Sequence, residues 1–176
     1  MIVSPLKNPM RLAPQIETTV AEDAYAAGLF DGEGCLQIRG GKKSRARAEW
    51  GHYSLTANAA NTALPVLLWM QERYGGSVFT KPRGVVGWRQ AYYWIVCGKS
   101  AAAFLAKIEP YVIVKRDQVV AGLVFGETLD GGAWRHNERP GRPLTDGGSV
   151  LRGLAYRAFR AAMNATGGKR PRRAAA

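Results

Sequence analysis

The stretch Ala26–Gly34, AAGLFDGEG, gathers small residues, two acids and three glycines directly behind the helix-forming segment AEDAY. Good helix formers, acids in the first turn and glycines at the end predict a helix over residues 21–31. Ala24, Gly28 and Gly32 follow one another at intervals of four residues, so one stripe of this helix carries almost no side chains. A bare stripe allows another helix to approach closely, whether that helix belongs to the same chain or to a second one.

Beyond this stretch, the hydrophobic pattern switches repeatedly between a period of two and a helical period. Strands are expected where polar and apolar residues alternate, at 35–39, 50–59, 77–83 and 89–98. Further helices are expected at 62–76, 99–108, 112–127 and 149–165. The order α-β-β-α-β-β-α-α-α predicts an α+β fold, with the helices packed on one face of an antiparallel sheet and the other face exposed to solvent.

The chain of 176 residues suits a single domain. We place this domain at 21–168, with a flexible proline-containing arm before it (1–20), a Gly-, Pro- and Arg-rich loop within it (129–149) and a basic disordered tail after it (169–176). No apolar run approaches the roughly 20 residues of a membrane span, and the first residues lack the apolar core of a secretory signal. We therefore expect a soluble cytoplasmic protein with no membrane partner.

The formal net charge of the chain is +12. The tail KRPRR supplies only four of these charges, so the body of the protein is basic as well. Such an excess is typical of proteins that bind a polyanion, most often nucleic acid. Two histidines are too few for a zinc finger or a histidine metal cluster. Cys35 and Cys97 are too few for a disulfide framework, and their apolar neighbours predict buried free thiols.

The segment AAGLFDGEGCLQI resembles the LAGLIDADG motif of homing endonucleases. Gly28, Leu29, Asp31 and Gly34 match the motif letter for letter, whereas Glu33 replaces its final aspartate. Later segments resemble the family in the family's order, namely ANAANTALPVLLWMQERYGGSVF, YYWIVCGKSAAAFLAKIEPYVIVKRDQ and AAMNATGG. The resemblance covers 21–168 and implies the αββαββα fold, in which an antiparallel sheet forms a DNA-binding saddle and the helices lie on its opposite face.

A single copy of the motif implies, by this resemblance, that the protein works as a homodimer. The two motif helices would then meet through Ala24, Ala27, Gly28, Asp31 and Gly32. Two acids at position 33 would come together at helix ends that already carry partial negative charge, and a divalent cation would relieve their repulsion.

The resemblance also implies site-specific double-strand cleavage of DNA by metal-dependent phosphodiester hydrolysis. Glu33 and the backbone carbonyl of Gly32 would hold Mg²⁺ or Mn²⁺, since such oxygens suit these ions, and Ca²⁺ would support binding without cleavage. Lys115 would lie near the scissile phosphate, and Asn61 would order the attacking water. Alternatively, Lys115 is a surface lysine and Asn61 is the N-cap of the next helix. Asp31 is expected to tie the helix end to its neighbours.

The expected partner is double-stranded DNA with a long pseudo-palindromic target. Alternation places polar side chains on the solvent face of the sheet, where they would contact base edges: Gln37, Arg39, His52, Ser54, Thr56, Asn58, Lys81, Arg83, Gln90 and Tyr92. Four basic residues of the loop after the first strand would contact phosphates: Lys42, Lys43, Arg45 and Arg47.

Two alternatives to an active endonuclease remain open. Glutamate at position 33 is one methylene longer than the family's aspartate, so the chain is also compatible with a relative that has lost cleavage and acts as an RNA maturase or a DNA-binding regulator. A protein of a different class, basic and structural or RNA-binding with no catalytic site, is the other alternative. The Ala-, Gly-, Arg- and Pro-rich composition favours a bacterial or phage origin, whereas neither the target sequence nor a host intron or intein follows from it.

Overall fold

The computed structural model describes residues 17–40, 53–81, 89–129 and 146–166. Its elements are, in chain order, α1 (Val20–Glu33), β1 (Gly34–Gly40), β2 (Tyr53–Asn61), α2 (Leu64–Tyr74), β3 (Ser77–Thr80), β4 (Tyr92–Cys97), α3 (Gly98–Ile108), the 3₁₀ helix η1 (Glu109–Tyr111), α4 (Arg116–Glu127) and α5 (Asp146–Thr166). The predicted order of helices and strands is confirmed. None of the helices in the described ranges combines the length and apolar character needed to cross a membrane.

Two boundaries differ from the sequence-based expectation. The helix expected at 112–127 begins only at Arg116, because Val112 is extended and ends the short η1 turn before α4 starts. The last helix begins at Asp146, inside the segment expected to be a loop at 129–149. The arm up to residue 16, most of that loop and the tail lie outside the described residues.

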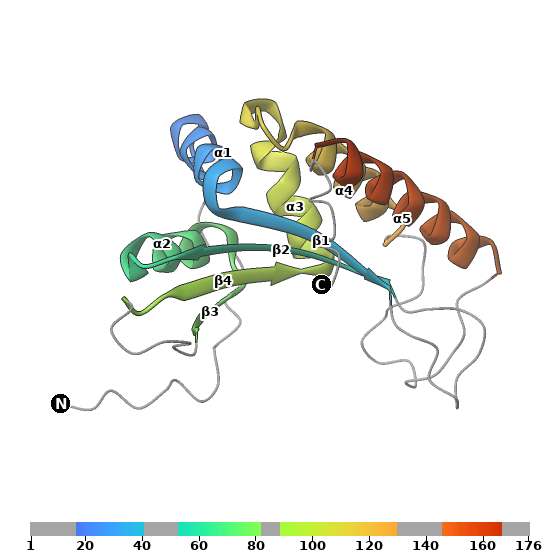
Figure 1. The fold of residues 1–176 in the computed structure, drawn as a ribbon. Helices are drawn as coiled ribbons and strands as arrows, with labels where there is room; N and C mark the ends of the chain where they lie inside the picture. The colour runs from blue at the N-terminus through green and yellow to red at the C-terminus, as the bar shows by residue number, and fades with distance from the viewer. Residues whose placement is uncertain (1–16, 41–52, 82–88, 130–145, 167–176) are drawn as a thin grey trace, which may run out of the picture.

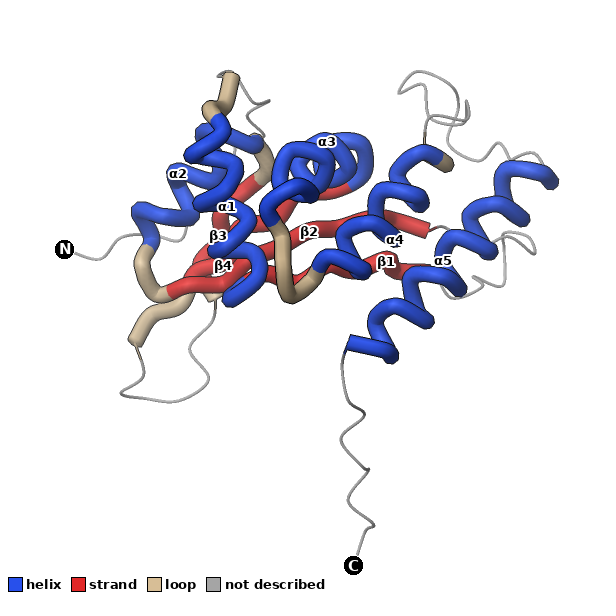
Figure 2. The backbone as a smooth tube through the Cα atoms, turned by 90° about the horizontal axis from the view of Figure 1, so that it is seen from above, coloured by secondary structure: helices blue, strands red, loops and turns tan. Residues whose placement is uncertain are grey.

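The four strands form one antiparallel sheet in the order β1-β2-β4-β3. In Figures 1 and 2 the helices lie over one side of this sheet. Strand alternation accounts for the arrangement, because Leu36 and Ile38 of β1 and Leu55 of β2 are buried on the helical side, whereas Gln37, between two of them, points to the other side. We call the side that no described helix covers the open face.

An aromatic cluster fills the core between the sheet and the first three helices. The ring of Phe104 in α3 makes edge-to-face contacts with Phe30 of α1, Tyr74 of α2 and Trp94 of β4, with ring centroids 5.0 to 5.5 Å apart. The indole N–H of Trp94 donates a 2.7 Å hydrogen bond to the carbonyl of Gly75, so its buried polar atom is satisfied. These contacts fix how α1 lies on the sheet, and hence which side of α1 faces outward.

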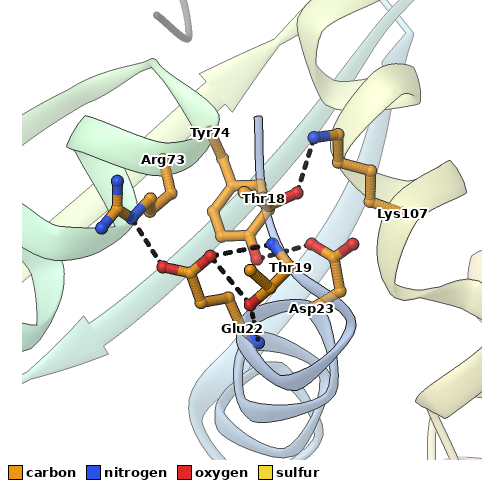
Figure 3. Close-up of polar contacts among 7 residues, drawn as sticks. All are labelled: Thr18, Thr19, Glu22, Asp23, Arg73, Tyr74 and Lys107. Atoms are coloured by element: carbon orange, nitrogen blue, oxygen red, sulfur yellow. Dashed lines mark hydrogen bonds and ion pairs between the residues drawn. The ribbon is translucent and has the colours of Figure 1, made fainter. Parts of the chain in front are cut away.

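The N-terminal end of α1 is fixed by polar contacts with its own first turn and with α2 (Figure 3). Thr19 and Glu22 form a capping box, in which each side chain accepts the backbone N–H of the other residue. Glu22 also pairs with α2, where the Nε of Arg73 lies 2.9 Å from its Oε1. The hydroxyl of Tyr74 donates a 2.8 Å hydrogen bond to Oδ1 of Asp23.

A contact with α3 completes this arrangement, since the ammonium of Lys107 donates a 2.6 Å hydrogen bond to the hydroxyl of Thr18 (Figure 3). Burial raises the pKa of Tyr74, and its hydrogen bond to Asp23 raises that pKa further. The backbone N–H that binds the carboxylate of Glu22 lowers the pKa of that residue. Helix α1 is therefore anchored at its start, and its end projects over the edge of β1.

Candidate functional site

One side of α1 is exposed along most of its length. Ala24, Gly28 and Gly32 all lie on this side, and a Cβ atom added to either glycine would meet no described atom within 4 Å. The bare stripe predicted from the spacing is thus not packed on the core of its own chain. Ala27 is fully buried in that core, so the prediction that it contacts a second subunit is wrong. Successive helical residues are about 100° apart, which turns position 27 away from the stripe.

The last turn of α1 passes directly into β1 at Gly34. The N–H of Gly34 donates to the carbonyl of Phe30, and a Cβ at this position would collide with the ring and carbonyl of Phe30. A glycine is therefore required for this abrupt change from helix to strand. As a result Glu33, the last helical residue, is held at one edge of the sheet.

Asp31 attaches the end of α1 to the segment that leads into α4. Its Oδ2 accepts the backbone N–H of Ile113 at 2.8 Å and of Val114 at 3.1 Å, and its Oδ1 accepts that of Lys115 at 3.0 Å. Three donors on one carboxylate form a compact set of charge-assisted bonds. The structural role predicted for Asp31 is confirmed.

Lys115 binds the same helix end through its side chain. Its ammonium donates to the carbonyl of Phe30 at 3.1 Å and also to that of Asp31. Carbonyls in the last turn of a helix lack intrahelical partners and carry partial negative charge. The last turn of α1 contains no basic residue of its own, so Lys115 supplies the missing cation from 84 residues away. The alternative that it is merely a surface lysine is wrong.

Glu33 is exposed at the end of α1, beside the carbonyls of the last turn. Within the described residues, no three His, Cys, Asp or Glu side chains gather into a metal-binding group. One chain therefore offers one carboxylate and backbone oxygens. This set suits Mg²⁺, which commonly takes one or two protein carboxylates and completes its shell with water and substrate phosphates.

Asn61, at the end of β2, lies at the same edge of the sheet as Glu33, because Gly34 pairs with Ala59 two residues earlier. Its Oδ1 accepts the N–H of Ala63 at 2.8 Å, just before α2 starts. The side chain thus stabilises the turn into α2, much as the N-cap alternative predicted, although Ala63 occupies the N-cap position itself.

The open face carries part of the polar set expected to contact DNA. The strand register places Gln37, Ser54, Thr56 and Asn58 there, because Gln37 pairs with Thr56 and the side chains of β2 alternate. Arg39 pairs with Ser54 and follows the same alternation. Lys81 is exposed just beyond β3. His52, Arg83 and the four basic loop residues lie outside the described residues: Lys42, Lys43, Arg45 and Arg47.

Two of the residues expected on the open face lie elsewhere. Tyr92 pairs with Asn61 and packs partly against the core, so it lies on the helical side of the sheet. The amide of Gln90 donates to the carbonyls of Lys81 and Ala91 at 2.6 and 2.9 Å, so it joins the segments flanking β3 and β4. The run Tyr92–Trp94 is aromatic throughout, and only the pairing of β4 with β2 decides which ring faces which side.

The residues that sequence reasoning missed on the open face are apolar or carry thiols. The register adds five of them: Cys35, Phe79, Tyr93, Ile95 and Cys97. The prediction of buried thiols is wrong, since Cys97 is exposed and Cys35 is half-buried. Alternation along β4, counted from buried Trp94 and Val96, was the signal that could have placed Tyr93 and Ile95.

Comparisons with known proteins give structural matches alone. No family model matches the chain, and no curated protein matches its sequence. The archaeal intron-encoded homing endonuclease I-Vdi141I complexed with DNA is similar, with a TM-score of 0.60 and 18% identity over 81% of this chain and 84% of that chain. The homing endonuclease I-CvuI in complex with its target gives 0.53 and 19% over 84% and 95%.

The matches also include longer chains. I-SmaMI bound to an uncleaved DNA target gives a TM-score of 0.57 at 14% identity over 81% of this chain, but only 48% of that one. The structural agreement includes the sheet and the helical layer above it, in the order already described. By these matches, the chain has the fold of the LAGLIDADG homing endonucleases.

Proposed function

We propose that two copies of this chain bind double-stranded DNA and cut both strands at a specific site with the help of a divalent metal ion. The observation that carries this proposal is the exposed bare stripe of α1, which ends in the exposed carboxylate of Glu33 at the edge of a sheet with an open second face. The same fold occurs in homing endonucleases crystallised with DNA targets, which supports the proposal.

The bare stripe is where the second copy would bind. A match to nearly all of the I-CvuI chain but half of the I-SmaMI chain supports one structural unit in this protein, so a site with two carboxylates needs a second chain. Ile113 and Val114, 84% and 68% exposed, are held beside the end of α1 by Asp31. Their apolar side chains would be covered by the partner subunit, which would add hydrophobic area to the contact of the stripes.

Glu33 and the backbone carbonyl of Gly32 would hold the metal ion, Mg²⁺ or Mn²⁺, together with the same groups of the second copy. When bound, such an ion activates water and stabilises charge on a phosphate. The chain positions the carboxylate by fixing α1 at both ends, through the capping box at Thr19 and the bonds to Asp31. Ca²⁺ would support DNA binding without cleavage.

Lys115 would act on the site through position and charge. Its ammonium holds the carbonyls of Phe30 and Asp31, two and three residues before Glu33, and so fixes the helix end that carries the carboxylate. A positive charge at this point would also attract the phosphate brought there by the DNA. Asn61 would contribute indirectly, by holding the turn into α2 at the same edge.

The open face and the basic loop would recognise DNA in different ways. Arg39 would contact a base edge, so Arg39→Ala should cost about 1–3 kcal/mol and relax the preference at one position in each half-site. Lys42 would contact phosphate, so Lys42→Ala should weaken binding to all sequences alike and reduce the salt dependence. Identical behaviour of the two variants would contradict recognition by the sheet.

The decisive test incubates the protein with a plasmid library carrying randomised inserts, with and without Mg²⁺. We expect linear products that share one sequence and require the metal. Sequence-specific binding without cleavage at any metal concentration would instead support a DNA-binding regulator, and preference for structured RNA would support a maturase. Absence of any sequence preference would favour a basic protein with no site.

A further inference from the structure

The open face is graded in composition from the edge near Glu33 to the far edge, and this gradient extends the function proposed above. Register defines its rows, because side chains that pair across strands lie on the same face. Gly34, next to Glu33, pairs with Ala59, which pairs in turn with Trp94. The row just beyond that position consists of Ala60, Tyr93 and Phe79 and is called the inner row.

The inner row is apolar. The rings of Phe79 and Tyr93 are stacked, with centroids 5.1 Å apart and planes inclined by 20°, and Ala60 adds a methyl group beside them. In the next row, Ile95 lies between Asn58 and Ser77. All three large apolar side chains, Phe79, Tyr93 and Ile95, are half-buried and face away from the helical core.

Polar residues take over with distance from Glu33. The third row contains Gln37, Thr56 and Cys97, and the fourth pairs Arg39 with Ser54. At the other end, the exposed Lys81 follows the inner row. Basic residues therefore lie on both sides of the apolar part, as a surface that follows a polyanion requires, and DNA is the partner that would cover both.

The spacing of the rows suits base pairs in a groove. Rows on one face of a strand are about 6.8 Å apart, and base pairs rise by about 3.4 Å, so each row corresponds to about two base pairs. In the major groove, thymine presents a C5-methyl group, which apolar side chains contact, whereas cytosine presents an amino donor and no methyl. An apolar row without donors or acceptors in the groove therefore favours thymine.

We propose that Phe79, Tyr93 and Ile95 recognise the C5-methyl groups of pyrimidines in the base pairs closest to the cleaved centre. Each half-site is then thymine-specific at its inner positions and is recognised by hydrogen bonds farther out, where Gln37 and Arg39 lie. The methyl group alone is the recognised feature, so 5-methylcytosine is accepted at the inner positions where cytosine is rejected.

The test uses the full chain and the target obtained from it by binding-site selection in Ca²⁺. Each inner thymine is replaced by deoxyuridine, which removes only the C5-methyl group. One buried methyl corresponds to about a fourfold change in affinity, and replacement in both half-sites to about fifteenfold. Deoxycytidine and 5-methyldeoxycytidine, each paired with guanine, are then compared at the same positions, and the methylated base should bind more tightly.

Two variants connect the effect to the protein. Ile95→Ala and Phe79→Ala, each checked for folding by thermal denaturation, should reduce the deoxyuridine penalty at their own positions to nearly onefold. Leu68→Ala is the matched control, since it removes a similar apolar side chain, 45% exposed, from helix α2, and it should keep the full penalty. Deoxyuridine at the outer positions is the control on the DNA.

The outcomes separate this proposal from the proposed function. Specific binding that is equally tight with thymine and deoxyuridine at every inner position overturns the methyl contact and leaves the endonuclease proposal intact. A methyl dependence that Ile95→Ala and Phe79→Ala leave unchanged also overturns it. Failure to select any target overturns both proposals.

Discussion

Replacing Gly28 by leucine separates the contact between two copies from the stability of one copy. A Cβ at position 28 meets no described atom within 4 Å, so the isolated chain has room for the larger side chain. Leucine is also a better helix former than glycine, by roughly 0.7 kcal/mol. The free energy of unfolding of Gly28→Leu should therefore equal or slightly exceed that of the wild type.

In the dimer the same change should be severe. Inserting a side chain into a close contact costs about 1–3 kcal/mol, and a twofold interface receives the insertion from both copies. The expected cost of about 2–6 kcal/mol corresponds to a 30-fold to 10⁴-fold weaker dimer. Because cleavage needs both copies of Glu33, double-strand cutting should be lost at concentrations where the wild type cuts.

The assay measures binding to a full target and to a single half-site, together with thermal denaturation. Gly28→Leu should bind the half-site as tightly as the wild type and lose only the additional affinity for the full site. Ala161→Leu, at an exposed alanine of α5, is the control and should change neither quantity. Ala27→Leu should instead destabilise the single chain by about 1–3 kcal/mol, because Ala27 is fully buried. Full dimerisation and cleavage by Gly28→Leu would refute this interpretation of the stripe.

Four further predictions follow from contacts already described. Glu33→Gln should reduce cleavage by orders of magnitude while binding in Ca²⁺ persists, and normal cutting would exclude Glu33 as a metal ligand. Asp31→Asn should lower the free energy of unfolding by about 2–4 kcal/mol in urea denaturation, because three N–H donors lose a charged acceptor; a loss below about 1 kcal/mol would contradict it. Gly126→Ala should destabilise by about 1–2 kcal/mol despite its gain in helix propensity, since its Cβ would lie 2.8 Å from that of Ala102; unchanged stability would contradict it. The raised pKa of Tyr74 predicts stability that is complete below pH of about 10 and is lost as the pH rises above it; Tyr74→Phe should flatten that alkaline decline, and an unchanged slope would count against the effect.

The sequence was sufficient for the fold because local patterns and the family resemblance agreed. Alternation in residues 53–61 and the glycines flanking Ala26–Gly34 each predicted the element that the structure contains. The errors at helix ends have local causes as well. The segment before Arg116 is apolar enough to continue a helix, but it follows the η1 turn at Pro110 and is held in place by Asp31 instead.

The site was predictable where one residue's neighbours in sequence determine its environment, as for Gly28 on the stripe and Asp31 at the helix end. It was not predictable where strand register decides. Whether Tyr92 or Tyr93 faces the open side depends on the pairing of β4 with β2, more than 30 residues away. The contact of Lys115 with the α1 carbonyls likewise joins distant segments, and no spacing rule describes it.

The bonds between Asp31 and Lys115 run in both directions, since the carboxylate of one accepts the N–H of the other and the ammonium of the second donates to the carbonyl of the first. The two positions must therefore be inherited together. A chimera that takes its first helix from one source and the segment before α4 from another would leave donors or carbonyls unmatched beside Glu33. The exchangeable unit is the whole fold, so a single-chain version of this protein is best made by joining two complete copies in tandem.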